Sequence, residues 1–167
     1  MNLSYNLKEM KNYFFKKENI FCLTFILIIF FFDRLTKKEI ISNLNENIYF
    51  INDYINFNLI WNIGIGFGFL STDSSILYNL VTLFIGFVIL FLFYVFITSE
   101  KIDKIIYSVI LGGALGNFYD RLLYKAVPDF IDLHYNNFHW FTFNVADIFI
   151  TIGIIIFILK IFFIENK

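Results

Sequence analysis

The stretch Ile76–Thr98, with the sequence ILYNLVTLFIGFVILFLFYVFIT, contains no charged residue. A helix needs about 20 apolar residues to cross the hydrocarbon core of a bilayer, so this stretch is long enough to span a membrane by itself. Three further apolar segments are found at Ile20–Phe32, Ile105–Tyr119 and Val145–Ile164. The segment at Ile20–Phe32 reaches spanning length only with flanking residues, and each of the others is close to that length.

The composition also agrees with a membrane protein. Of the 167 residues, 59% are hydrophobic and 16% are charged, and the mean hydropathy is +0.70. Soluble domains average about 45–50% apolar and about 25% charged residues. The net charge of −1 provides no overall positive field, so we expect no nucleic-acid partner. Cys22 is the single cysteine, which excludes a disulfide within the chain.

The four apolar segments predict an all-α polytopic membrane protein with four transmembrane helices, formed as a single domain over residues 1–167. The inner connection at Ser99–Lys104 is a short polar turn, whereas the outer connections at Lys37–Ser75 and Leu122–Asn144 are long. Long loops are where a binding or catalytic site is often assembled. The stretch Ile48–Leu59 mixes apolar and polar positions, which is compatible with short strands.

The distribution of basic residues predicts the orientation in the membrane. Cytoplasmic loops carry an excess of Lys and Arg, so the end of the molecule with more of them is expected inside. With both termini inside, the cytoplasmic basic residues are Lys8, Lys11, Lys16, Lys17, Lys101, Lys104, Lys160 and Lys167, and the outer ones are Arg34, Lys37, Lys38, Arg121 and Lys125. We therefore expect both termini in the cytoplasm. Asp33-Arg34 follows the first apolar segment in place of a small-residue cleavage site, which favours an uncleaved helix over a signal peptide.

Ionisable groups at membrane depth cost about 2.5–3.5 kcal/mol each on insertion scales, so they are candidates for function. Asp33 and Lys37 are four residues apart and share a face of a helix, where they can pair. By themselves these two are typical of a charged helix end whose side chains reach the interface. Gly112 and Gly116, also four apart, indicate close packing between helices.

Asparagine and aspartate recur together near the ends of the last two apolar segments. Asn117 and Asp120 share a helical face and are expected to point into the bundle, because they would lack hydrogen-bond partners in lipid. Asn144 and Asp147 repeat this spacing at the start of the fourth segment, where Asp147 lies near the positive end of a helix dipole. Asp129 precedes them in a loop. Together these residues predict a polar cluster on the outer side of the bundle.

The two histidines, His134 and His139, are five residues apart in a predicted loop and form no HExxH motif. We interpret them as surface or interfacial residues and expect no metal and no cofactor.

Five stretches in this order resemble one family, the bacterial lipoprotein signal peptidases, or signal peptidase II. They are Asp33–Lys37, Asn62–Gly64, Gly112–Arg121, Val127–Asp132 and Phe143–Asp147. The resemblance covers nearly the whole chain. The family's catalytic aspartates match Asp129 and Asp147. Its substrate-binding or site-supporting polar residues match Asn62, Asn117, Arg121 and Asn144, and its structural polar residues match Asp33, Lys37 and Asp120.

The resemblance implies a membrane-embedded aspartic endopeptidase at the outer face of the bacterial inner membrane. Its substrate would be a prolipoprotein whose cysteine already carries diacylglycerol, and cleavage would fall just before that cysteine. The resemblance also implies a small extracytoplasmic strand-containing cradle and a short lid-like segment, expected within Lys37–Ser75. We expect a monomer in contact with membrane lipid.

The chain departs from the family pattern at several positions. Trp61 stands at a place that is usually basic, Ile65-Gly66 replaces a pair of alanines, Pro128 replaces an aliphatic residue beside Asp129, and Arg34 replaces a glutamine.

Three alternatives remain open at this point. The first keeps an aspartic peptidase but pairs Asp120 with Asp147. The second is a small transporter or channel that uses the outer-face acids as an ion path, although acids gathered at one face argue against conduction. The third is a non-catalytic scaffold packed through its glycines, which gives no reason for two Asp–Asn pairs.

Overall fold

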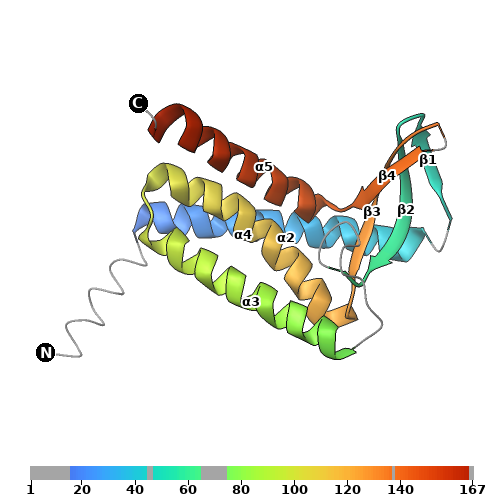
Figure 1. Cartoon of the computed structure of the whole chain (residues 1–167), viewed down its shortest axis with the longest axis horizontal. Coiled ribbons are helices and arrows are strands. Elements are labelled where there is room, and N and C mark those ends of the chain that lie inside the picture. The colour runs from blue at the N-terminus through green and yellow to red at the C-terminus, as the bar shows by residue number, and fades with distance from the viewer. Residues whose placement is uncertain (1–15, 45–46, 65–74, 137, 166–167) are drawn as a thin grey trace, which may run out of the picture.

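The computed structural model describes residues 16–44, 47–64, 75–136 and 138–165. Within these ranges the chain forms a bundle of long helices with a sheet at one end (Figure 1). The helices are α2 (Lys17–Asn43), α3 (Ser75–Thr98), α4 (Lys101–Tyr124) and α5 (Val145–Lys160), the last continued by the π-helical turn η1 (Ile161–Glu165). The strands are β1 (Tyr49–Asn52), β2 (Ile55–Asn62), β3 (Val127–Tyr135) and β4 (Phe138–Phe143). Ile65-Gly66 and any lid-like segment at 65–74 lie outside the described residues.

Helix α4 packs against α2, α3 and α5. Glycines make these close approaches possible, because a Cβ atom at Gly112 would lie 2.7 Å from the Ile29 Cβ atom of α2. A Cβ at Gly113 would lie 2.5 Å from the Ala146 carbonyl oxygen of α5, and Gly116 lies against the Asp33 carboxylate. The helix packing predicted for Gly112 and Gly116 is therefore confirmed.

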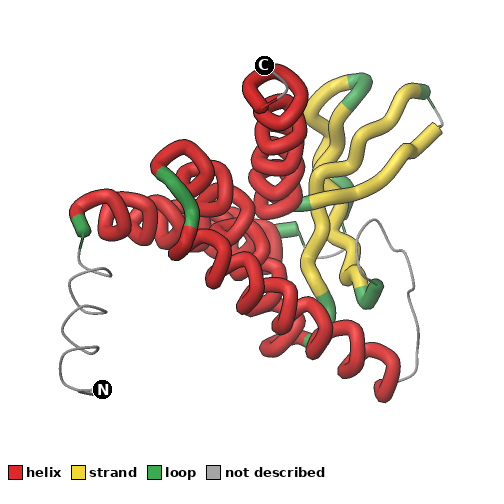
Figure 2. The backbone as a smooth tube through the Cα atoms, turned by 60° about the vertical axis from the view of Figure 1, so that its left-hand side comes forward, coloured by secondary structure: helices red, strands yellow, loops and turns green. Residues whose placement is uncertain are grey.

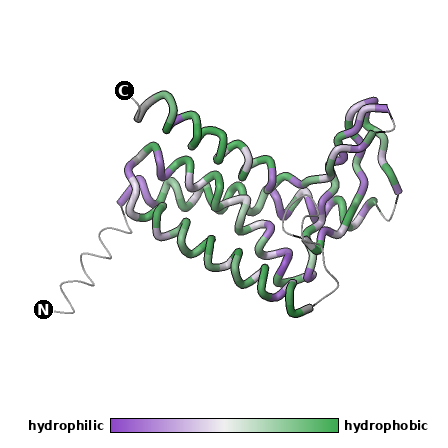
Figure 3. Tube along the Cα trace, in the orientation of Figure 1, coloured by the Kyte–Doolittle hydropathy of each residue, from purple (hydrophilic) through white to green (hydrophobic). Residues whose placement is uncertain are grey.

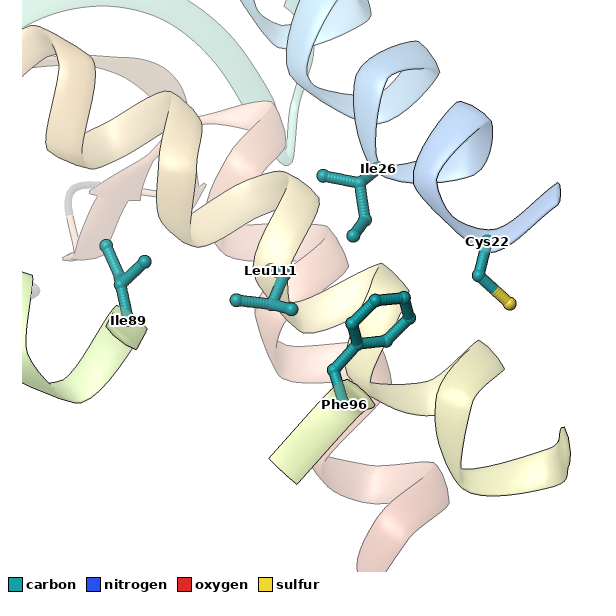
Figure 4. Close-up of a cluster of buried hydrophobic side chains, with 5 residues drawn as sticks. All are labelled: Cys22, Ile26, Ile89, Phe96 and Leu111. Carbon is teal, nitrogen blue, oxygen red and sulfur yellow. The ribbon is translucent and has the colours of Figure 1, made fainter. Parts of the chain in front are cut away.

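An apolar core fills the space between α2, α3 and α4. Its buried side chains are Cys22, Ile26, Ile89, Phe96 and Leu111 (Figure 4). The outer surfaces of the helices carry large apolar side chains that are more than half exposed, among them Phe84, Phe87 and Phe91 on α3. An apolar surface of this kind is suited to lipid rather than to water.

Two parts of the predicted fold class are wrong. The protein is not all-α, because the described chain contains a four-stranded antiparallel sheet in the order β1-β2-β3-β4. In addition, three described helices rather than four have the length and composition of a membrane span: Lys17–Asn43, Ile76–Thr98 and Val145–Phe163. Helix α4 falls short because a helix packed on three sides needs small residues for close approach, and its ends carry charged ones.

The sheet occupies most of the expected loop Leu122–Asn144 and part of Lys37–Ser75. Strand β3 does not alternate between buried and exposed residues, since its first four residues, 127–130, are all buried. The sheet joins the end of α2 through a second core formed by Ile40, Leu44 and Phe130. Figure 2 shows the strands beside the ends of the helices, and Figure 3 shows hydrophilic segments gathered where the bundle meets the sheet. This junction holds the candidate site.

Candidate active site

Strand pairing brings Asp129 of β3 beside the end of β2. Asp129 is opposite Ile60 in the register, and Asn62 is opposite Val127, so the Asn62 side chain lies within reach of Asp129. The Asn62 Nδ2 atom donates to Asp129 Oδ2 at 2.8 Å, and its Oδ1 atom accepts from the Gly64 backbone N–H at 2.8 Å. Asp129 is 3% exposed. The turn after β2 therefore fixes the amide that holds this carboxyl group.

The start of α5 brings Asp147 to the same place. Asn144 is the N-cap of α5, and its Oδ1 atom accepts from the Asp147 backbone N–H at 3.1 Å. In return the Asp147 Oδ2 atom accepts from the Asn144 backbone N–H at 3.1 Å, which completes a capping box. The side-chain amide of Asn144 also holds Asp129, because its Nδ2 atom donates to Asp129 Oδ1 at 2.6 Å. One fully buried asparagine thus contacts both aspartates.

Asn117 of α4 reaches Asp147 from the other side. Its Nδ2 atom donates to Asp147 Oδ1 at 2.7 Å, and its Oδ1 atom accepts from the Lys37 ammonium group at 2.7 Å. The expectation that Asn117 and Asp120 point into the bundle is confirmed, since Asp120 is fully buried and Asn117 is partly buried.

Behind the aspartates lies a buried layer of charged residues between α2 and α4. The Lys37 Nζ atom lies 2.9 Å from Asp33 Oδ2 and 2.7 Å from Asp120 Oδ2, and all three residues are fully buried. Arg34 pairs with the second oxygen of Asp120 and lies over the Tyr119 ring. The interpretation of Asp33 and Lys37 as a charged helix end at the interface is therefore wrong, and their predicted pairing is confirmed.

The same layer argues against the alternative pairing of Asp120 with Asp147. Both carboxylate oxygens of Asp120 are held by cations, one by Arg34 and one by Lys37. Asp33 has a structural contact as well, because its Oδ1 atom accepts from the Ala146 backbone N–H at 3.0 Å and so fixes the first turn of α5. The structure brings Asp129, rather than Asp120, into the shared contact with Asn144 and Asp147.

Arg121 lies one contact away from the aspartates. Its Nη2 atom donates to the Gly64 carbonyl at 2.6 Å, so it holds the backbone that positions Asn62. The Tyr78 hydroxyl donates to the Arg121 carbonyl at 3.2 Å. Sequence reasoning missed Tyr78 and the backbone roles of Gly64 and Ala146. For Gly64 and Ala146 a signal was available, because they lie in the Asn62–Gly64 and Phe143–Asp147 stretches, whereas nothing marks Tyr78 within its apolar segment.

Two of the departures from the family pattern lie at the edges of this arrangement. Trp61 is opposite Pro128 in the register, and its ring packs edge-on against Tyr124 with centroids 5.4 Å apart. Pro128 is almost completely buried, directly before Asp129.

The surroundings of Asp129 alter its acidity. Burial and the negative charge of Asp147 raise the pKa of Asp129 from 3.8 to about 6, against hydrogen bonds from Asn62 and Asn144 that lower the pKa. A carboxyl group with such a pKa can both hold and release a proton near neutral pH. Two neighbouring carboxyl groups that share one proton are the arrangement used by aspartic proteases.

An apolar groove opens beside Asp147. It encloses about 250 Å³ between the hairpin of β3 and β4 and helix α5. The lining residues other than Asp147 are Leu133, Phe141, Phe143, Ile148, Thr151 and Ile152. A groove of this composition can accept an apolar side chain or part of an acyl chain next to the carboxylate.

The two histidines are not isolated. The pairing of β3 with β4 places His134 opposite His139, and both lie close to Asp132. The signal that sequence reasoning passed over is their position on the two arms of one hairpin.

Comparisons with known proteins agree with this geometry. The family model for signal peptidase (SPase) II matches residues 25–163. The chain is 45% identical to the lipoprotein signal peptidase of Pelagibacter ubique (strain HTCC1062) over 166 residues, which cover 97% of this chain and 96% of that protein. It is 47% identical to the lipoprotein signal peptidase of Blochmanniella pennsylvanica (strain BPEN) over 120 residues, with 68% of this chain and 72% of that protein covered.

Solved structures share the fold. A bacterial membrane enzyme structure obtained by the in meso method at 2.3 Å resolution has a TM-score of 0.72 and 29% identity, covering 84% of this chain and 87% of that one. The comparisons support a peptidase rather than the transporter, channel or scaffold considered above. Sequence, fold and relatives together show that the chain belongs to the signal peptidase II family, the lipoprotein signal peptidases, which cleave the signal peptides of lipoproteins.

Proposed function

We propose that the chain cleaves its substrate by aspartic catalysis, with Asp129 and Asp147 as the catalytic pair. The observation that supports this best is the shared contact with Asn144, whose side chain donates to Asp129 while its backbone N–H donates to Asp147. A residue that contacts both carboxyl groups keeps them close enough to act on one water and one peptide bond.

The raised pKa of Asp129 supports a pair that shares one proton. Burial and the negative charge of Asp147 raise this pKa to about 6. In the proposed mechanism Asp129 carries the shared proton and Asp147 accepts one from water. The water oxygen then bonds to the scissile carbonyl carbon while Asp129 gives its proton to the carbonyl oxygen. When the resulting diol collapses, the C–N bond breaks and the proton held by Asp147 passes to the leaving amine. The hydroxyl proton returns to Asp129 as the carbonyl re-forms.

The substrate in this proposal is a prolipoprotein with diacylglycerol on its cysteine, cut just before that residue. The apolar groove supports this choice, because it lies beside Asp147 and continues along α5, one of the three candidate membrane spans. We further propose that the chain acts as a monomer in contact with membrane lipid.

We place the sheet and the aspartates on the outer side of the inner membrane. The start of α2 and the end of α5 lie at the same end of the bundle, opposite the sheet (Figure 1). Lys17, Lys101, Lys104 and Lys160 lie at that end, which supports a cytoplasmic position for both termini. A C-terminal reporter that works only outside the cytoplasm should give no signal, and a strong signal would contradict this orientation.

The decisive experiment measures cleavage of a purified diacylglyceryl prolipoprotein by the purified chain and by two variants, Asp129→Asn and Asp147→Asn. Each variant should lose at least about 10²-fold in rate, because each lacks a group that must take and give a proton. Asp53→Asn makes the same chemical change at an exposed aspartate in the turn between β1 and β2 and should cleave normally. Near-normal turnover by either site variant would rule out this pair.

A further inference from the structure

The β3–β4 hairpin carries three potential metal ligands that peptide cleavage does not use. Asp132 and His134 lie on β3 and His139 lies on β4, and one ligand atom from each falls within 4.8 Å of the other two. The His139 Nδ1 atom is 2.8 Å from Asp132 Oδ2, and the His134 Nδ1 atom is 3.8 Å from the same oxygen. These are the only two histidines of the chain.

The burial of His134 indicates that these three residues do more than form one hydrogen bond at the surface. The His134 side chain is only 8% exposed, and its Nδ1 atom is buried without a hydrogen-bond partner. A buried polar atom without a partner costs about 1–3 kcal/mol. The two imidazole rings are stacked, with centroids 5.3 Å apart, so both point to the same side of the hairpin.

We propose that Asp132, His134 and His139 form a binding site for one divalent transition-metal ion of the zinc class. Imidazole nitrogen combined with a carboxylate oxygen is a ligand set that zinc and its neighbours accept. Because His139 is exposed, solvent can reach the remaining coordination positions.

The distances suit such an ion without a large rearrangement. Ligand atoms at about 2.0–2.1 Å from a tetrahedral zinc ion lie about 3.3 Å from one another. The two separations from Asp132 Oδ2, 2.8 Å to His139 Nδ1 and 3.8 Å to His134 Nδ1, lie on either side of this value. The exposed His139 ring can turn to adjust the first, and the free Nδ1 atom of His134 gains a partner.

The metal site is separate from the catalytic pair. Asp132 contacts His139 across the hairpin, whereas Asp129 accepts from Asn62 and Asn144, so the two carboxyl groups have different partners. A bound ion would instead tie β3 to β4. Strand β4 ends at Phe143, directly before Asn144, so the ion would stiffen the strand that leads into the site.

The test titrates ZnCl₂ into the full-length chain without an affinity tag, in an uncharged detergent, by isothermal calorimetry. The expected result is one zinc ion per chain, with affinity at least about tenfold lower in His139→Gln and in Asp132→Asn. Asp53→Asn, on the exposed turn between β1 and β2, should bind zinc as the unaltered chain does. Co²⁺ should give visible absorption bands with the unaltered chain and weaker bands with His139→Gln.

Two further measurements, thermal unfolding with zinc and cleavage with a chelator, also test the metal site. Zinc should raise the unfolding temperature of the unaltered chain but not that of His139→Gln, whose exposed side chain is not needed for folding. A chelator should leave prolipoprotein cleavage unchanged within twofold. Absence of saturable zinc binding, or equal affinity in the unaltered chain and both ligand variants, would overturn the site. If a chelator abolished cleavage and zinc restored it, the metal site would not be separate from catalysis.

Discussion

At the scale of single residues, Asn144 combines two roles that can be separated by mutation. As the N-cap of α5 its side-chain oxygen stabilises the helix start, and as an amide donor it holds Asp129. Serine can cap a helix but has no amide to reach Asp129, whereas alanine can do neither. Comparing the two substitutions therefore distinguishes folding from positioning.

We predict that Asn144→Ser keeps most of the stability but lowers kcat by about 10-fold to 100-fold, because a small misplacement of a catalytic group can cost about 10² in rate. Asn144→Ala should lose the same activity and, in addition, about 1 kcal/mol of stability through the missing cap. The measurements are prolipoprotein cleavage and thermal unfolding in detergent. Equal activity of Asn144→Ser and the unaltered chain would show that the contact with Asp129 is not needed.

The raised pKa of Asp129 predicts the pH dependence of cleavage. With Asp147 ionised, Asp129 holds the shared proton below about pH 6 and loses it above, because burial and the Asp147 charge raise its pKa to about 6. The value of kcat/KM, which reports the free enzyme, should therefore fall as the pH rises through this region. The profile should be measured with one substrate in one detergent.

Asn144→Ser provides the control for this assignment. The amide hydrogen bond from Asn144 favours the ionised form of Asp129 and so lowers its pKa. Without it the falling limb of the profile should move to higher pH. A limb that stays in place, or moves to lower pH, would show that the titrating group is not Asp129.

At the scale of elements, helices α2 and α4 are joined by ion pairs instead of apolar packing near the site. Lys37 lies between the buried carboxylates of Asp33 and Asp120 and also donates to Asn117. Removing one member of a buried ion network leaves the others without compensation, which costs about 3–5 kcal/mol.

We therefore predict that Lys37→Met lowers the unfolding temperature strongly, although methionine fills a similar volume. Lys38→Met is the matched control, because Lys38 is the neighbouring exposed lysine on the same helix and should leave stability almost unchanged. Both are measured by thermal unfolding in one detergent. A Lys37→Met chain as stable as the control would show that the network does not hold the two helices together.

Contacts between residues that are close in the sequence could be predicted, whereas contacts between distant segments could not. The pairing of Asp33 with Lys37 was predictable because residues four apart on a helix are neighbours. Their burial was not, because it depends on Asp120, which comes from another helix. Short strands were expected within Ile48–Leu59 and in a small cradle, but β3 and β4 were treated as a loop. They were missed because β2 and β3 pair across all of α3 and α4, and because the buried start of β3 lacks a strand's alternation.

The candidate site, too, could be predicted only in part. Asn117, Asp120, Asn144 and Asp147 could be assigned to the bundle interior because polar groups avoid lipid. The contact of Asn62 with Asp129 required the register of β2 on β3, and the contact of Arg121 with Gly64 required the turn that follows. The cluster of Asp132 with the histidines likewise depends on the register of β3 on β4, which the loop interpretation left out.

At the scale of the whole molecule, the site lies where two environments meet. Hydrophobic residues make up most of the length of the helices, and hydrophilic residues gather where the helices join the sheet (Figure 3). A peptide bond that reaches Asp147 must therefore come close to the boundary between acyl chains and head groups. This position suits a substrate that is itself held in the bilayer.

The position of the site predicts that the enzyme requires lipid on the substrate cysteine. Acyl chains stabilise membrane attachment by about 0.8 kcal/mol for each buried CH₂ group, so two chains hold the substrate firmly at one depth. Fixing the scissile bond at that depth also lowers the orientational cost of reaction. The measurement compares cleavage of one prolipoprotein with and without diacylglycerol on its cysteine, once in vesicles and once in detergent. We expect a decrease of at least about 10²-fold without the lipid.

A loss that appears only in vesicles and disappears in detergent would mean that the lipid acts by anchoring alone, whereas a loss in both would mean that the groove beside Asp147 binds it directly. Equal rates in both media would contradict the lipid requirement while leaving the aspartate pair intact.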